Sequence, residues 1–332
     1  MANKTNPSYP TSSIDPYKFL QLKQNRDGSV TRLTQTPSTQ ASSDPNSTSL
    51  VLTKDCPLNT VDNTFLRLFL PKIALNPSSS SSKLPVIVYF HGGGFVFHHA
   101  DSTMFHDFCS ELAVFTSALV VSVEYRLAPE HRLPAAYDDS IDALRWIRNE
   151  EHDQDEWLAK YGDCSKCFLM GSSVGGNIAY IVGLKVLKLV SDLGPLEIKG
   201  LILHQPYFGG MVRTGSELNL IDDPYVPLSA NDLFWELSLP VGADRDHEYS
   251  NLKIGEGMEL WNRMKELGWR VLVTGCSGDP LVDRQVELVK LLKEKGVLVK
   301  GHFTEGDYHA VEVFDQLKFR SFLLLVKDFM TL

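Results

Sequence analysis

Cysteine, positive charge and long apolar runs are all scarce in this chain. Its five cysteines among 332 residues are an odd number, which fits a reducing compartment. Lys and Arg number 32 against 41 Asp and Glu, and the formal net charge of −9 disfavours nucleic acid and anionic membranes as partners. No window approaches a membrane span, and residues 1–7 lack the apolar core of a signal peptide. We therefore expect a cytoplasmic protein that binds neither nucleic acid nor a membrane.

Internal repeats and metal-binding patterns are also missing. Cys164 and Cys167 form a Cys-x-x-Cys pair, a spacing used by zinc and redox sites, but no second pair accompanies it. We interpret both as ordinary residues beside a strand and predict no metal. The oligomeric state stays open, with a monomer as the expectation.

The most informative segment present is Gly171-Ser172-Ser173-Val174-Gly175. It follows a short apolar run with strand character and precedes a helical pattern that extends to residue 193. A serine on such a sharp strand-to-helix turn needs small neighbours, which the two glycines supply, and its hydroxyl then stands near the positive end of a helix. We predict Ser173 as a nucleophile. The alternative is a tight turn in which the two serines only cap the helix.

A second segment, His91-Gly92-Gly93-Gly94, follows the apolar run 84–90, which predicts a fully buried strand. Consecutive glycines leave no side chain in the way of a substrate carbonyl, so their amides can point at an oxyanion. The alternative is a flexible loop, but a strand, this loop, a crossover helix, a strand and the serine turn follow the chain order of an α/β-hydrolase. We predict an oxyanion hole formed by Gly93, Gly94 and the amide of Val174, and a structural role for His91.

A general base is expected after the serine, where four histidines occur. His302 lies inside an alternating strand pattern, His204 ends an apolar run, and His247 sits in a charged loop. His309 follows the last strand in a glycine-containing loop before the final helix, a position that presents its ring to the site. We predict His309 as the base.

The acid that orients this base should follow the preceding strand. Residues 270–275 are a short β-rich run, and Asp279 is the first carboxylate after it, within reach of the ring of His309. Asp283 is predicted instead to cap the helix that begins near Arg284. Elsewhere, residues 28–32 and 64–70 alternate in polarity and predict antiparallel edge strands, and residues 14–20 predict a short helix.

Together these segments resemble the plant carboxylesterases of the hormone-sensitive-lipase-like branch of the α/β-hydrolases, over nearly the whole chain. The motifs that carry the resemblance are the glycine loop with Phe95, the run from Tyr125 to Asp139, the serine turn with Gly176-Asn177 after it, residues 278–283, and Tyr308-His309.

The resemblance implies an α/β-hydrolase fold with a mostly parallel central sheet flanked by helices. It implies one domain over residues 1–332, in which residues 1–25 and about 205–250 contribute a helical cap. Residues 1–13 are expected to be a mobile tail.

Carried over residue by residue, the resemblance implies a triad of Ser173, Asp279 and His309, which agrees with the assignment made from the residues. Two positions depart from the family. Ser172 stands where the family usually has an acidic or other polar residue, and Val174 stands where it most often has alanine. We expect the branched side chain of Val174 to narrow the acyl pocket.

Two other functions stay open beside a hydrolase. One is a binding protein like the related gibberellin receptors, although their branch replaces the triad histidine that this chain keeps. The other is a non-hydrolytic relative, a cyclase or acyltransferase, since an intact triad serves those reactions too.

Apolar residues near the catalytic segments or in the expected cap are candidates for substrate contact, although each more often belongs to the core. They are Phe95, Phe97, Phe208, Met211, Ile221, Phe234, Trp235 and Tyr308. Because no basic cluster accompanies them, an anionic substrate is not expected. We predict a serine carboxylesterase that hydrolyses short to medium acyl esters of small neutral alcohols or phenols through an acyl-enzyme, without a metal or organic cofactor.

Overall fold

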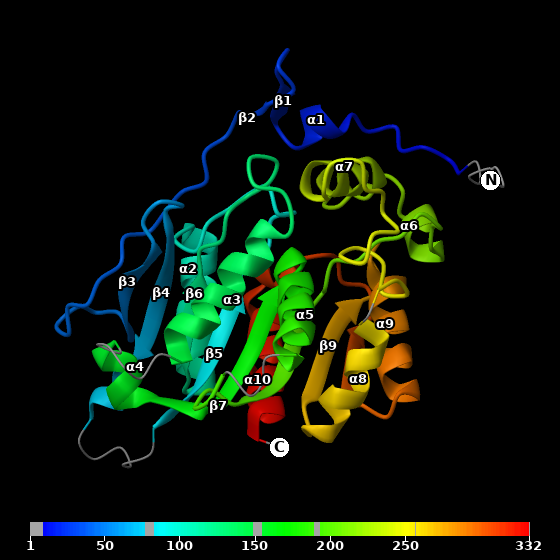
Figure 1. Cartoon of the computed structure of the whole chain (residues 1–332). Helices are drawn as coiled ribbons and strands as arrows, with labels where there is room; N and C mark the ends of the chain where they lie inside the picture. The colour runs from blue at the N-terminus through cyan, green and yellow to red at the C-terminus, as the bar shows by residue number, and fades with distance from the viewer. Residues whose placement is uncertain (1–8, 77–82, 149–154, 189–192, 256, 332) are drawn as a thin grey trace.

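The computed structural model describes residues 9–76, 83–148, 155–188, 193–255 and 257–331, and its centre is an eight-stranded sheet. In chain order the strands are β3 (Val51–Asn59), β4 (Thr64–Pro71), β5 (Leu84–Phe90), β6 (Leu119–Val123), β7 (Gly162–Ser172), β8 (Ile198–His204), β9 (Arg270–Cys276) and β10 (Leu298–Thr304). In space their order is β10-β9-β8-β7-β5-β6-β4-β3 (Figure 1). Neighbours from β10 to β6 are parallel, and β4 and β3 are antiparallel.

Helices cover both faces of this sheet, which confirms the predicted α/β-hydrolase architecture. They are α1 (Pro16–Phe19), α2 (Thr103–Thr116), α3 (Ala135–Arg148), α4 (Glu156–Tyr161), α5 (Val174–Leu187), α6 (Gly215–Asn219), α7 (Leu228–Ser238), α8 (Gly257–Glu266), α9 (Val282–Glu294) and α10 (Gln316–Thr331), with 3-10 turns η1 (Lys72–Leu75) and η3 (Val311–Val313). Within the described ranges, none of the helices has both the length and the apolar character to cross a bilayer.

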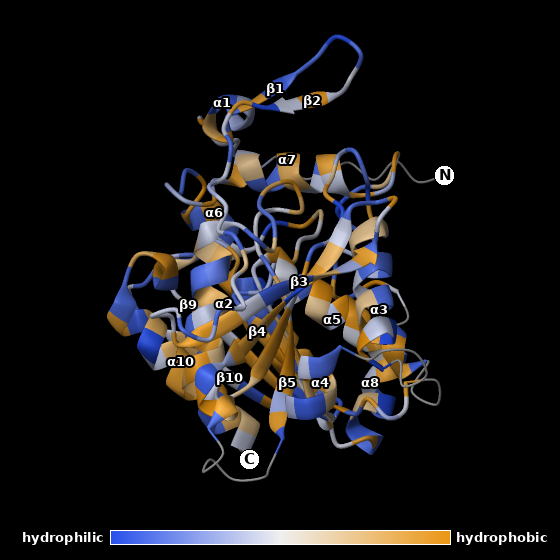
Figure 2. Cartoon of the chain, turned by 90° about the vertical axis from the view of Figure 1, so that its left-hand side faces the viewer, coloured by the Kyte–Doolittle hydropathy of each residue, from blue (hydrophilic) through white to orange (hydrophobic). Residues whose placement is uncertain are grey.

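The core has two halves, one on each face of the sheet. Val86, Val88 and Phe90 of β5 belong to the apolar cluster that includes residues of α3, α5, α8 and α9. Ile87 and Tyr89 point the other way and belong to the cluster with α2 and α10. A strand covered on both faces needs apolar residues at every position, which is why 84–90 is a continuous apolar run. Figure 2 shows apolar residues gathered along the strands inside the molecule.

The carboxyl ends of the parallel strands meet at one edge of the sheet, and the predicted site segments leave from these ends. The glycine loop follows β5, and the serine turn follows β7; Phe90 pairs with Gly171 in the register of these two strands. Asp279 follows β9 and His309 follows β10, and these strands are also neighbours. The chain order therefore brings all four segments to the same edge.

Above this edge lie α1, α6, α7 and a two-stranded ribbon of β1 (Leu22–Gln24) and β2 (Val30–Arg32) (Figures 1 and 2). Residues 1–8 of the expected mobile tail lie outside the described residues. The hydroxyls of Ser12 and Ser13 donate to the carboxylate of Asp222, at 2.6 and 2.7 Å. The N-terminal segment is thus held against the segment that carries α6 and α7.

Neither of the two segments predicted as edge strands lies at an edge of the main sheet. Residues 64–70 form β4, which is antiparallel as predicted but lies inside the sheet, because β3 pairs along its outer side. Residues 28–32 contribute β2, which pairs with β1 outside the main sheet. Alternation of polarity indicates one covered face, and it does not say which neighbour a strand takes. The helix predicted to reach residue 193 is α5, which ends at Leu187.

Candidate active site

Ser173 occupies the sharp turn between β7 and α5. Its backbone has φ 56° and ψ −119°, a strained conformation for a residue with a side chain. A Cβ atom on Gly171 would overlap the carbonyl oxygen of Gly175, and one on Gly175 would overlap that of Phe90. Glycine is therefore required on both sides of the serine. The turn is fixed further by Ser173 N, which donates to the carbonyl of His204 at 2.9 Å.

The three residues predicted as a triad lie together. His309 Nε2 is 3.1 Å from Ser173 Oγ, and His309 Nδ1 is 2.8 Å from Asp279 Oδ2. Because the carboxylate accepts, the proton of the neutral ring belongs on Nδ1, which leaves the Nε2 lone pair facing the serine. Asp279 is fully buried, and its other oxygen accepts from Leu281 N at 2.9 Å. The imidazole is thus placed to take a proton from Ser173.

The basicity of His309 is set by its buried surroundings. Burial by itself lowers the pKa of the ring, but the charge of Asp279, its hydrogen bond and the more distant charge of Glu312 raise it further than burial lowers it. The net result is a pKa above the ordinary 6.5. A stronger base is favoured for removing the proton of a serine hydroxyl.

Asp283 does not cap α9, which corrects the prediction for this residue. The N-cap position of α9 is Leu281, without a side-chain hydrogen bond to the helix. The Asp283 carboxylate instead accepts from Ser216 N of α6 at 2.8 Å. It therefore ties α6 to the core, while Asp279 alone of the two contacts His309.

The glycine loop packs directly against the serine. A Cβ atom on Gly92 would lie 3.5 Å from the Cβ of Ser173. Gly93 and Gly94 have φ values of 118° and 66°, and among the described residues their amides have no backbone acceptor. The amide of Val174 is the first of α5 and so has no acceptor inside the helix. These three amides are available to an oxyanion.

The side chain of Val174 does not narrow the acyl pocket, contrary to the expectation. It is fully buried and belongs to the core cluster on the α5 side of the sheet. At the other position that departs from the family, Ser172 accepts a hydrogen bond from the hydroxyl of Tyr89 at 3.0 Å. Position 174 points into the protein, whereas Ser172 and Ser173 line the active-site cavity.

His91 has the structural role predicted for it. Its Nδ1 is 2.8 Å from the carbonyl of Gly92, and its ring stacks on Tyr125 with centroids 4.2 Å apart. Complete burial lowers its pKa to about 3, so the ring is neutral at pH 7. It holds the start of the glycine loop.

Sequence reasoning missed two glutamines that hold the triad. Gln205 Oε1 accepts from Ala310 N at 2.7 Å, and its Nε2 lies 3.4 Å from the carbonyl of Tyr308. One side chain therefore brackets His309, because it bonds to the residue before it and to the residue after it. Gln285 Nε2 donates to Asp279 Oδ2 at 3.0 Å. Glutamine has no motif of its own here, and no spacing in the sequence marks either residue.

A cavity of about 360 Å³ opens beside the triad. Of the residues predicted to contact substrate, Phe97 and Phe234 line it. The aromatic and apolar residues that sequence reasoning missed are Met104, Phe105, Phe108, Tyr207, Tyr225, Val226, Val313 and Phe314. Val313 and Phe314 carry one signal that the sequence offers, their nearness to His309 in the chain. The lining contains seven Phe and Tyr side chains, which suits an apolar ligand.

The other residues predicted to contact substrate do not line this cavity. Phe95 and Trp235 are buried against each other with ring centroids 5.9 Å apart, and Phe208 packs on Tyr180. Met211 lines a different cavity, between the N-terminal segment and α7, and Ile221 lies outside both. Tyr308 is stacked behind Tyr225. Closeness in sequence to a catalytic segment did not settle which way these side chains point.

His204 and Glu312 form part of the cavity wall. His204 Nε2 lies 3.1 Å from Glu312 Oε2, close enough for charge attraction but without the alignment of a hydrogen bond. Burial alone raises the pKa of Glu312, but the charge of His204 and its contact lower it further, to a net value below the ordinary one. The wall therefore carries an ionised carboxylate, which disfavours anionic ligands.

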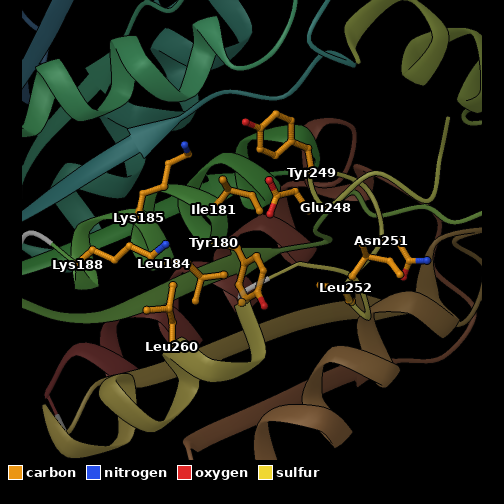
Figure 3. Close-up of a pocket in the computed structure, with 12 residues that line it drawn as sticks. Tyr180, Ile181, Leu184, Lys185, Lys188, Glu248, Tyr249, Asn251, Leu252 and Leu260 are labelled. Atoms are coloured by element: carbon orange, nitrogen blue, oxygen red, sulfur yellow. The ribbon is translucent and has the colours of Figure 1, made fainter. Parts of the chain in front are cut away.

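A further cavity, of about 260 Å³, lies between α5, α8 and residues 248–252 and contains none of the triad (Figure 3). Lys185 and Lys188 project from α5 on one side of it, and Glu248 and Tyr249 lie opposite. It offers no nucleophile with a neighbouring base. In the described part of the chain, no three His, Cys, Asp or Glu side chains are grouped to hold a metal ion. Of these two cavities, the one beside Ser173 is therefore the one that holds a nucleophile next to a base.

Comparisons with known proteins agree on one family. The family profile described as the alpha/beta hydrolase fold matches residues 87–313. Carboxylesterase 20 of Arabidopsis thaliana is 49% identical over 97% of this chain and 98% of its own length. A 3-O-acetylpapaveroxine carboxylesterase of Papaver somniferum is 46% identical over 95% of this chain and 97% of its own. Among solved structures, a hyperthermophilic esterase of Pyrobaculum calidifontis is 26% identical, with a TM-score of 0.68 over 84% of each chain.

Proposed function

The chain belongs to the α/β-hydrolase fold family and, within it, to the plant carboxylesterases, which are carboxylic ester hydrolases, and from this premise we propose that it works through an acyl-enzyme on Ser173. The observation that carries the proposal is the chain of contacts from Ser173 Oγ to His309 Nε2 and from His309 Nδ1 to Asp279 Oδ2, at 3.1 and 2.8 Å. Nucleophile, base and orienting acid are within hydrogen-bonding reach of each other.

In the first half of the reaction, His309 removes the proton of Ser173 as the serine oxygen attacks the ester carbonyl. Asp279 holds the ring in the required tautomer and stabilises the imidazolium that forms. The amides of Gly93, Gly94 and Val174 receive the negative charge on the former carbonyl oxygen. One such donor contributes about 3–4 kcal/mol to lowering the barrier.

In the second half, the proton on His309 passes to the leaving alcohol, and the acyl group remains on Ser173. Water then takes the place of the alcohol, loses its proton to His309 and attacks the acyl carbonyl. Collapse of this second intermediate returns the proton to Ser173 and releases the acid. Every step uses side chains and amides of this chain, so the mechanism calls for no metal or organic cofactor.

The proposed substrates are short to medium acyl esters of small neutral alcohols or phenols. A cavity of about 360 Å³ with an aromatic lining favours a compact apolar ester, and the ionised Glu312 in its wall disfavours anions. The name of the Papaver somniferum relative refers to an acetyl ester, which supports a short acyl group. A series of acyl lengths tests this part of the proposal, because a preference for emulsified long-chain triacylglycerols would contradict it.

The nucleophile is tested by hydrolysis of p-nitrophenyl esters together with labelling by an organophosphate, located by mass spectrometry. We expect the label on Ser173 and loss of turnover in His309→Ala. His302→Ala is the matched control, since this histidine is an exposed residue of β10 and should keep wild-type turnover.

Two results would contradict the proposal. One is a label on Ser172 or another residue. The other is a folded wild-type protein that neither hydrolyses the esters nor takes the label, which would favour a binding protein instead. Folding is checked independently by circular dichroism.

A further inference from the structure

We propose that an aromatic cluster at the mouth of the active-site cavity binds the alcohol half of the ester and selects a planar aromatic alcohol; Tyr225 and Phe314 of this cluster line the cavity, and Tyr308 supports Tyr225 by stacking on it. We call these three side chains the aromatic platform. The inference rests on the proposed acyl-enzyme function, because it assigns one half of that substrate to one part of the surface.

The aromatic platform joins two distant parts of the chain. Tyr225 comes from the segment before α7, and its ring lies on that of Tyr308 with centroids 4.3 Å apart and planes 4° from parallel. Phe314 lies beside both, with centroids 6.0 Å from Tyr225 and 6.3 Å from Tyr308. These spacings are typical of aromatic groups that interact with one another. The result is a cluster of three aromatic rings, two of which also line the active-site cavity.

The platform is continuous with the active-site cavity and is open to solvent. Tyr225 and Phe314 line the cavity that holds Ser173 and His309, yet they are 42% and 66% exposed. Val313, which lines the same cavity, is 40% exposed. Exposed apolar side chains gathered beside a cleft indicate a binding surface. A ligand attached to Ser173 can therefore reach the platform without a change of fold.

The chemistry decides which half of the ester lies there. The carbonyl oxygen must point at the amides of Gly93 and Gly94. The leaving oxygen must lie within hydrogen-bonding distance of His309 Nε2, because this atom donates the proton to it. The alcohol group consequently extends on the His309 side of the site. Tyr308 precedes His309 directly, and Phe314 follows it across η3, so the platform belongs to that side.

Flat ring faces distinguish among neutral alcohols. A fused aromatic ring stacks on such faces over its whole area, whereas a short alkyl alcohol ends inside the cavity and gains nothing from them. Glu312, which lines the same cavity as an ionised group, makes an anionic alcohol unfavourable. The occupant favoured by these features is a neutral, planar aromatic alcohol.

The test uses two acetates that share the acyl group, 4-methylumbelliferyl acetate and ethyl acetate. The quantity measured is the selectivity ratio, kcat/KM for the aromatic ester divided by kcat/KM for the ethyl ester. We expect Phe314→Ala and Tyr225→Ala each to lower this ratio by about fivefold, through KM of the aromatic ester. Tyr225→Phe retains the ring and should restore the ratio.

The control is Leu324→Ala. Leu324 is also an exposed apolar residue, 53% exposed, but it lies on α10 and does not line the cavity. It should keep the wild-type ratio. An unchanged ratio in Phe314→Ala, or an equal fall in Leu324→Ala, overturns the assignment. So does Phe314-dependent sedimentation of the protein with phosphatidylcholine vesicles at an unchanged ratio, which would make the patch a lipid contact. Failure of the wild type to hydrolyse either ester counts instead against the proposed function.

Discussion

Gln205 gives the sharpest test of how the site is held together, because one side chain fixes the loop that carries His309. Its Oε1 accepts from Ala310 N at 2.7 Å, and its Nε2 faces the carbonyl of Tyr308 at 3.4 Å. Ala310 itself has φ 61°, a left-handed conformation that costs a residue with a side chain about 1–2 kcal/mol. The bond from Gln205 helps to offset this cost. We therefore examine the replacement Gln205→Met, which keeps length and removes both polar atoms.

The size of the effect follows from the burial of the two partners. Gln205 is 3% exposed, whereas Ala310 is half-buried, so water replaces part of the lost bond. We expect the free energy of unfolding to fall by about 1 kcal/mol, the low end for an unpaired amide. We expect kcat to fall by about tenfold, because the His309 ring is no longer held at its position opposite Ser173. KM should change little, because Gln205 acts on the base.

The assay is hydrolysis of p-nitrophenyl acetate across pH, with thermal unfolding measured on the same samples. Gln205→Glu keeps an acceptor for Ala310 N, so it should recover part of kcat, and its added negative charge should raise the pKa of His309 seen in the pH profile. Gln24→Met, at an exposed position of β1, controls for the substitution itself. Wild-type kcat in Gln205→Met, or a loss confined to KM, would refute the positioning role.

Three further predictions concern the acid, the base and the glycine loop. Asp279→Asn should lower kcat by about 10⁴-fold and move the pKa of His309 downward in the pH profile, whereas Asp283→Asn should cost far less; the reverse order would identify the wrong carboxylate. Because the pKa of His309 is raised and the neutral ring is the active form, kcat/KM of the wild type should increase with pH through a midpoint above 6.5. A midpoint below 6.5 would contradict the proposed effect of Asp279 on His309. Gly94→Ala, at φ 66° and against the ring of Phe234, should reduce kcat by about 10²-fold or more and lower the free energy of unfolding by about 1–2 kcal/mol, measured by calorimetry.

The sequence predicted which segments meet beside Ser173, because each segment is specified by local rules. Glycines around Ser173 are demanded by backbone atoms of the same turn and of the adjoining strand, as the overlaps at Gly171 and Gly175 show. The order of parallel strands then places whatever follows each strand at one edge, so Asp279 and His309 were identified from their positions after β9 and β10. Their contact distances agree with that placement.

The sequence did not predict the cavity wall or the supports of the triad, because these depend on side chains from distant segments. Phe95 and Phe97 lie two residues apart in one loop, yet the first packs on Trp235 in the core and the second lines the cavity. The strand β3 was missed, so β4 was expected at the edge of the sheet. A tight turn has no repeating period from which the direction of a side chain follows.

By itself, then, the sequence determined the fold class, the serine turn, the glycine loop and the chain order of the proposed nucleophile, acid and base, since backbone geometry and chain order are properties of contiguous residues. Only the tertiary structure decided that Gln205 brackets His309, that Glu312 pairs with His204, and that Tyr225 stacks on Tyr308. Each of these contacts joins segments far apart in the chain or turns on the direction of one side chain. Such contacts arise only when the segments that follow different strands meet at one edge of the sheet, and no local pattern encodes that meeting.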